Sequence, residues 1–103
     1  MLTMNDENQI RKAIWARKDA VDARMAEPGF EALPTDEQDA QVLALMLDVT
    51  PEAARRCLGA EARADERERL WTGLDELFRY GKRSALRPLK DVLARHETLK
   101  KPD

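Results

Sequence analysis

The first periodic run of apolar side chains begins near Asp6. Its apolar positions are Ile10, Ile14, Val21 and Met25, with Ala13 and Ala20 beside them. Residues that are three, four or seven apart share one face of an α-helix, so the run predicts an amphipathic helix of about 20 residues. Residues 27–34 contain a proline and a glycine and predict a loop. We expect Phe30 and Leu33 to return from this loop into the core.

The first of two helix start signals lies at residues 35–38. Thr35 precedes two acidic residues and Gln38, which is the arrangement of a capping box with Thr35 as the N-cap. We therefore expect a helix from Asp36 to about Asp48. Its apolar side chains are Val42, Leu43, Leu45, Met46 and Leu47.

The second start signal is the sequence Thr50-Pro51-Glu52. Threonine is a favourable N-cap, proline is tolerated at the first helical position, and glutamate is stabilised near the positive end of the helix dipole. The signal predicts a short helix that ends at Leu58, before Gly59.

A longer helix is predicted from Glu61 to Tyr80, with Gly81 following its C-terminus. Residues 61–69 are charged almost all round, so we expect this half to project into solvent or toward a partner. The second half carries an apolar stripe and is expected to pack. The stripe consists of Leu70, Leu74, Leu77 and Phe78, flanked by Trp71.

A final helix is expected to begin near Pro88, because proline is tolerated in the first turn of a helix and not deeper. Its apolar stripe consists of Leu89, Val92, Leu93, His96 and Leu99. We interpret His96 as a core histidine bonded to a carbonyl or a carboxylate. The alternative is a pH-sensitive contact or a ligand.

These runs predict an all-α protein: a compact bundle of about five helices in a single domain over residues 1–103, with residues 1–5 and 100–103 frayed. Of the 103 residues, 43% are hydrophobic, enough for one core, and 37% are charged, as is typical of helices with solvated outer faces. The sequence contains neither a signal-peptide pattern nor an apolar stretch that would span a membrane. We therefore expect a cytoplasmic location and no membrane partner.

The scarcity of reactive side chains disfavours catalysis. The chain has one serine, one cysteine and one histidine, which are Ser84, Cys57 and His96. Nucleophilic catalysis needs a positioned base and an orienting group, and a zinc site needs more than one histidine and one cysteine. No glycine-rich phosphate loop is present. We expect no enzymatic activity, no metal and no cofactor.

Residues 36–58 resemble the helix-turn-helix unit of DNA-binding proteins. Two steeply crossing helices need a small residue where they touch and apolar residues around a tight turn. Ala44 fits the small position, and Leu47 and Val49 flank the turn. Asp48 replaces the usual turn glycine, and aspartate adopts the left-handed conformation more readily than most residues.

The resemblance implies a binding role for the second helix of this pair. Ala54 and Cys57 would form its inner face. Glu52, Arg55 and Arg56 would then face a DNA groove, where arginine binds guanine edges or phosphate. Arginines that are buried or paired with acidic residues would not contact DNA in this way.

Charge is unevenly distributed along the chain. Residues 35–59 contain five acidic and two basic side chains, and this net charge of −3 opposes docking onto phosphates. Residues 79–101 contain eight basic and two acidic side chains, a net charge of +6. The basic segment would follow a phosphate backbone if it lay beside the helix-turn-helix, or it would dock onto an acidic protein surface.

Two functions remain open. The first is a small helix-turn-helix DNA-binding regulator or accessory factor, expected to be dimeric. Its predicted DNA contacts are Glu52, Arg55, Arg56, Lys82, Arg83 and Arg87. The second is a helical protein-interaction module, such as an adaptor, inhibitor or anti-activator, that makes no contact with nucleic acid. Its predicted interface residues are Trp15, Arg63, Arg67, Trp71 and Lys90.

Overall fold

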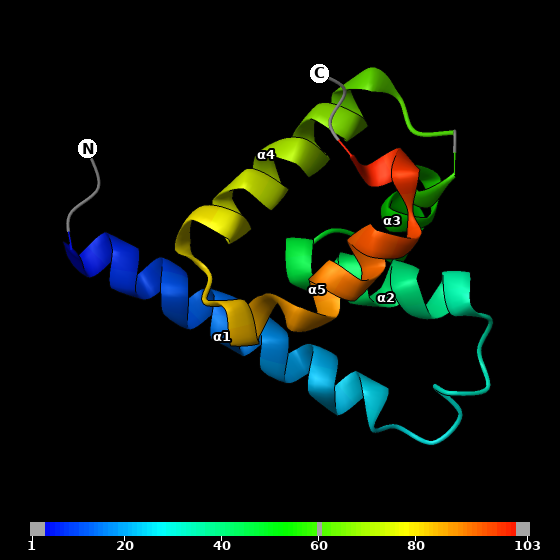
Figure 1. Cartoon of the computed structure of the whole chain (residues 1–103), viewed down its shortest axis with the longest axis horizontal. Coiled ribbons are helices and arrows are strands. Elements are labelled where there is room, and N and C mark those ends of the chain that lie inside the picture. The colour runs from blue at the N-terminus through cyan, green and yellow to red at the C-terminus, as the bar shows by residue number, and fades with distance from the viewer. Residues whose placement is uncertain (1–3, 60, 101–103) are drawn as a thin grey trace.

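The computed structural model describes residues 4–59 and 61–100, and all regular structure in this range is helical. The elements are α1 (Met4–Met25), α2 (Thr35–Leu47), α3 (Pro51–Leu58), α4 (Ala64–Tyr80), α5 (Arg83–Arg95) and a short 3₁₀ helix, η1 (Glu97–Leu99) (Figure 1). The predicted all-α fold of about five helices is confirmed. Of the termini predicted to be frayed, residues 1–3 and 101–103 lie outside the described range, whereas residues 4 and 5 belong to α1.

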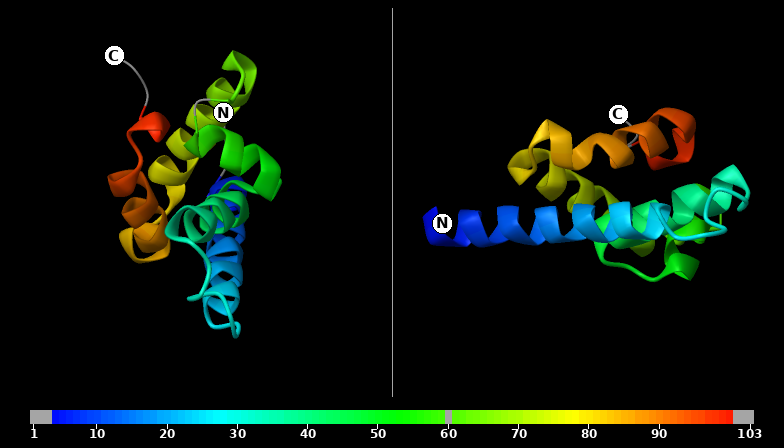
Figure 2. Two further views of the ribbon diagram at one scale, coloured as in Figure 1. Left: turned by 90° about the vertical axis from the view of Figure 1, so that its right-hand side faces the viewer. Right: turned by 90° about the horizontal axis from the view of Figure 1, so that it is seen from below.

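Helix α2 lies at the centre of the fold and packs against the other four α-helices. Helices α3 and α5 lie on opposite sides of it (Figure 2). The core contains side chains from every α-helix together with Phe30 from the α1–α2 loop and Leu99 from η1. Phe30 is buried, as predicted, and Leu33 packs against the core while remaining partly exposed.

The buried stripe of α1 is shorter than its sequence pattern predicts. Ile14 and Val21 are fully buried, whereas Met25 at the end of the helix is 44% exposed. Met25 is the last residue of α1, where the helix leads into the loop.

The start of α2 differs from the prediction. Pro34 is the N-cap and Thr35 is the first helical residue, and no side chain caps the helix. The amide Nε2 of Gln38 donates to the carbonyl oxygen of Leu33 at 2.9 Å and to that of Glu31 at 3.3 Å. The predicted capping box is therefore wrong, because the preceding loop turns back and presents carbonyl groups to Gln38. At α3 the prediction is confirmed: the hydroxyl of Thr50 accepts a hydrogen bond from the backbone N–H of Ala53 at 3.1 Å.

The last two α-helices also begin elsewhere than predicted. Helix α4 begins at Ala64 rather than Glu61, so residues 61–63 are not part of a charged helix. Helix α5 begins at Arg83 and contains Pro88 within it. Proline removes the hydrogen bond to the carbonyl group four residues earlier, which here belongs to the exposed Ser84 and is open to water.

Candidate macromolecule-binding surfaces

A tight turn joins α2 to α3. Asp48 adopts the left-handed conformation, with φ 55° and ψ 49°, and the N–H of Val49 donates to the carbonyl oxygen of Ala44 at 3.0 Å. Ala44, Ala54 and Cys57 are buried, as predicted for the inner faces of the pair. Val49, by contrast, is 43% exposed. Capped helix pairs of this kind also occur as purely structural units.

The guanidinium of Arg55 on the outer face of α3 is held by a carboxylate from α2. Its Nε and Nη2 donate to the two carboxylate oxygens of Glu37 at 2.7 and 2.6 Å. The hydrogen bond from Arg55, assisted by one from Gln41, lowers the pKa of Glu37 to about 2. Glu52 is exposed and its carboxylate lies 3.7 Å from Nη1 of Arg55.

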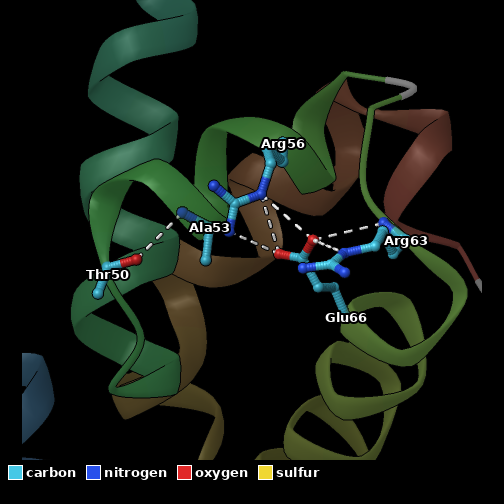
Figure 3. A network of polar contacts seen from close by, with 5 residues as sticks. All are labelled: Thr50, Ala53, Arg56, Arg63 and Glu66. Atoms are coloured by element: carbon cyan, nitrogen blue, oxygen red, sulfur yellow. Dashed lines mark hydrogen bonds and ion pairs between the residues drawn. The ribbon is translucent and has the colours of Figure 1, made fainter.

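Arg56 is held in the same way by a carboxylate from α4. Its Nε and Nη2 donate to Oε2 of Glu66 at 3.0 and 2.8 Å, and the backbone N–H of Arg63 donates to Oε1 at 3.4 Å (Figure 3). The hydrogen bond from Arg56 lowers the pKa of Glu66. Both arginines predicted to face DNA are therefore paired with carboxylates of their own chain.

Three basic residues form a row on the outer face of α5, which we call the α5 ridge: Arg83, Arg87 and Lys90. They are spaced four and three residues apart, so they share one face of the helix. All three are exposed, as is the neighbouring Lys82. Among residues 4–59 and 61–100 none of these four side chains has an ion pair or a side-chain hydrogen bond.

The α5 ridge and α3 do not form one surface. They lie on opposite sides of α2, as both views in Figure 2 show. A phosphate-binding segment beside the α2–α3 pair was predicted as one possibility, but Arg83 and Arg87 on α5 do not lie next to Arg55 and Arg56 on α3.

An apolar groove runs between α4 and the chain formed by α5 and η1, and we call it the α4–α5 groove. It has a volume of about 330 Å³. Its lining residues are Trp71, Leu74, Asp75, Phe78, Leu93, Leu99 and Lys100. Phe78 is 45% exposed here, although its place in the α4 stripe predicted packing.

Trp71 is partly buried in the wall of this groove, as its position beside the stripe predicted. Its indole Nε1 is buried and has no hydrogen-bond partner within the described part of the chain. An indole N–H usually finds a partner when it is buried. The wall of the groove therefore contains a buried hydrogen-bond donor that lacks an acceptor among residues 4–59 and 61–100.

The other predicted interface residues are dispersed. Trp15 is 37% exposed on α1 and is not among the groove residues. Arg63 is exposed, with its Nε 3.9 Å from Glu66. Arg67 donates to the backbone carbonyls of Thr98 and Gly59, each at 3.0 Å, so it fastens the start of α4 to the neighbouring segments.

A buried carboxylate that the sequence pattern did not predict lies between α2 and the end of α5. Asp39 is 2% exposed and binds both Arg95 and His96. The carboxylate of Asp39 is the partner that our interpretation of His96 as a satisfied core histidine required. Asp39 lies in the polar first turns of α2. The only sequence signal for its burial is that it directly precedes Ala40, which is buried.

The remaining reactive groups form no cluster in the described residues. Burial raises the pKa of the Cys57 thiol, which keeps it protonated. No group of three metal-binding side chains occurs in residues 4–59 and 61–100. In the same range, no helix is both long and apolar enough to cross a membrane.

Comparison with known proteins adds no relative to this description. No family model matches the sequence. Searches of curated proteins and of solved structures likewise return no significant match.

Proposed function

We propose that this chain is a helical protein-binding module whose binding face consists of the α4–α5 groove and the adjoining α5 ridge. The observation that carries the proposal is Phe78, an aromatic side chain 45% exposed in an apolar groove. Aromatic residues in such positions are the usual anchors of protein interfaces.

The groove has the chemistry of a protein-docking site. Five of its lining residues are apolar, and they come from three separate elements, α4, α5 and η1. Grooves between helices commonly accept the apolar face of another helix. Burial of the exposed part of Phe78 would contribute about 1 kcal/mol to such binding.

Lys90 beside the groove is available, in contrast to the arginines on α3. Lys90 lies one helical turn before Leu93 on α5, so it borders the groove, and it has no ion pair in the described residues. Arg55 and Arg56 would first have to leave the carboxylates of Glu37 and Glu66. A partner that binds Lys90 breaks no ion pair of the described residues.

Site-specific photo-crosslinking in the cells that make the protein tests this proposal. A photoreactive phenylalanine at position 78 should give an adduct of discrete mass, and Lys90→Glu in the same chain should reduce its yield. The matched control places the same group at Met25, which is equally exposed on α1. Equal adduct yields at the two positions, or none at position 78, would contradict the proposal.

DNA binding is the second candidate, and the left-handed turn of the α2–α3 pair favours it. Fluorescence anisotropy with a random DNA duplex tests it, because binding to phosphates weakens steeply as salt increases. Arg55→Ala with Arg56→Ala should weaken binding if α3 contacts DNA. Arg83→Ala with Arg87→Ala should do so if the α5 ridge follows the phosphates. A duplex that does not bind at low salt excludes this candidate.

A further inference from the structure

The α4–α5 groove is bordered by acidic side chains along α4. Glu68 and Asp75 are seven residues apart, so they share one face of the helix, and we call them the α4 acidic row. Both are exposed, and Asp75 also lines the groove. Neither side chain has an ion pair within residues 4–59 and 61–100.

The opposite border of the groove is basic. The α5 ridge, Arg83, Arg87 and Lys90, occupies the exposed face of α5 next to Leu93, which lines the groove. The apolar strip thus has the carboxylates of Glu68 and Asp75 along one edge, with Arg79 following Asp75 at the end of α4, and cations along the other. Unpaired charges of both signs beside an exposed aromatic residue form a surface that is complementary to itself.

We infer that the occupant of the α4–α5 groove is a second copy of this chain, bound face to face in a twofold-symmetric dimer. The inference rests on the proposed function, because it names the protein that this face binds. A twofold dimer uses the same patch on both subunits, so its edges must match when one copy is rotated onto the other.

Charge selects the direction of the twofold axis. An axis that runs along the groove places the α4 acidic row of each copy opposite the α5 ridge of the other. An axis that runs across the groove would place acidic row on acidic row and ridge on ridge, and the like charges would repel. The dimer axis therefore follows the groove, and Phe78 of each copy lies within the apolar centre.

Other occupants fit the two edges less well. An acidic peptide would be attracted by Lys90 and Lys100 but repelled by Asp75 on the opposite edge. A nucleic-acid backbone would meet the same repulsion along the α4 acidic row. A second copy supplies both signs at the required places.

Sedimentation equilibrium of the full chain at low salt tests the dimer. The unaltered chain should reach twice the monomer mass with increasing concentration. Phe78→Asp should raise the dissociation constant about 10-fold or more, as expected when a central aromatic anchor is lost. Met25→Asp, which changes an equally exposed residue on α1, should leave the constant unchanged. Circular dichroism confirms that both variants remain folded.

A charge exchange tests whether the two charged borders of the groove lie in the interface. One chain carries Glu68→Lys and Asp75→Lys, and a second carries Arg83→Glu, Arg87→Glu and Lys90→Glu. Each chain alone should be monomeric, because both borders of its groove then have the same sign. An equimolar mixture of the two should form a heterodimer, since opposite signs again meet along both edges.

Several outcomes overturn the inference. A chain that stays monomeric at all concentrations, while position 78 crosslinks to a different protein, excludes the dimer and leaves the protein-binding proposal intact. A dimer that is unaffected by Phe78→Asp, or variants that do not assemble when mixed, excludes the groove as the interface. Duplex DNA binding that the α5 ridge variant abolishes in a monomeric chain assigns the ridge to phosphates instead.

Discussion

Asp39 and His96 connect the interior of α2 to the end of α5, although they are 57 residues apart in sequence. Nε2 of His96 donates to Oδ2 of Asp39 at 2.8 Å, and Arg95 donates to both carboxylate oxygens, at 2.5 and 3.0 Å. Burial alone would raise the pKa of the Asp39 carboxyl. The hydrogen bonds from Arg95 and His96 outweigh burial, so this pKa lies below its usual value.

Replacement of Asp39 should destabilise the fold. Asp39→Asn leaves Arg95 and His96 without their anionic partner and should lower the free energy of unfolding by about 2 kcal/mol. Urea denaturation followed by circular dichroism measures the change. Asp36→Asn is the control, because the Asp36 side chain is 87% exposed and its carboxylate lies 4.0 Å from His96. An equal effect of the two substitutions would contradict a special role for the buried carboxylate.

Acid should weaken the contact between α2 and α3. The pKa of Glu37 is about 2 in the folded chain and 4.5 ordinarily, so its stabilising contribution is complete above pH 4.5 and is lost as the pH falls toward 2. Glu37→Gln should make stability less dependent on pH in this range, and Arg55→Ala, which removes the partner of Glu37, should do the same. Urea denaturation at a series of pH values tests this, and identical pH profiles for Glu37→Gln and the unaltered chain would refute it.

Glycine at position 48 should stabilise the turn between α2 and α3. Asp48 has a φ of 55°, a conformation that costs most L-residues energy and glycine little. Asp48→Gly should therefore raise the free energy of unfolding by about 0.5–1 kcal/mol. Asp19→Gly, at an exposed position within α1, should instead lower it by a few tenths of a kcal/mol. Thermal unfolding of both variants distinguishes the effect of the left-handed turn from a general effect of glycine. A loss of stability in Asp48→Gly would contradict the prediction and show that the aspartate side chain is needed.

Two glycines should respond oppositely to alanine. A Cβ at Gly81 would lie 2.6 Å from the carbonyl oxygen of Leu77 and 2.9 Å from Cδ2 of Leu86, so Gly81→Ala should cost about 1–3 kcal/mol. At Gly73 the nearest atom is Cδ2 of Leu47, at 3.0 Å, and this partly exposed side chain can shift. Gly73→Ala should stabilise α4 by up to about 1 kcal/mol, because alanine is the better helix former. Calorimetry of the two variants tests the contrast, which fails if both change stability in the same direction.

Helix boundaries show where local sequence signals are sufficient. Thr50 and Pro51 correctly predicted the start of α3, because a threonine hydroxyl reaches the N–H groups of the next turn without help from distant residues. The equivalent signal at Thr35 failed, since Gln38 bonds to loop carbonyls instead. The predicted start of α5 near Pro88 was wrong for a related reason. Ala85 and Leu86 are buried in the core, and their packing extends the helix to residues before the proline.

The sequence by itself determined the number and approximate positions of the α-helices, the buried inner face of the α2–α3 pair and the left-handed turn at Asp48, because these depend on side-chain spacing and on hydrogen bonds within a few residues. Only the tertiary structure decided which charges are neutralised. Arg55 meets Glu37 across 18 residues, Arg56 meets Glu66 across 10, and Asp39 meets His96 across 57. Such pairs depend on how helices cross, which a linear pattern of charges does not contain. For the same reason, the groove beside Phe78 became evident only from the packing of α4 against the rest of the fold.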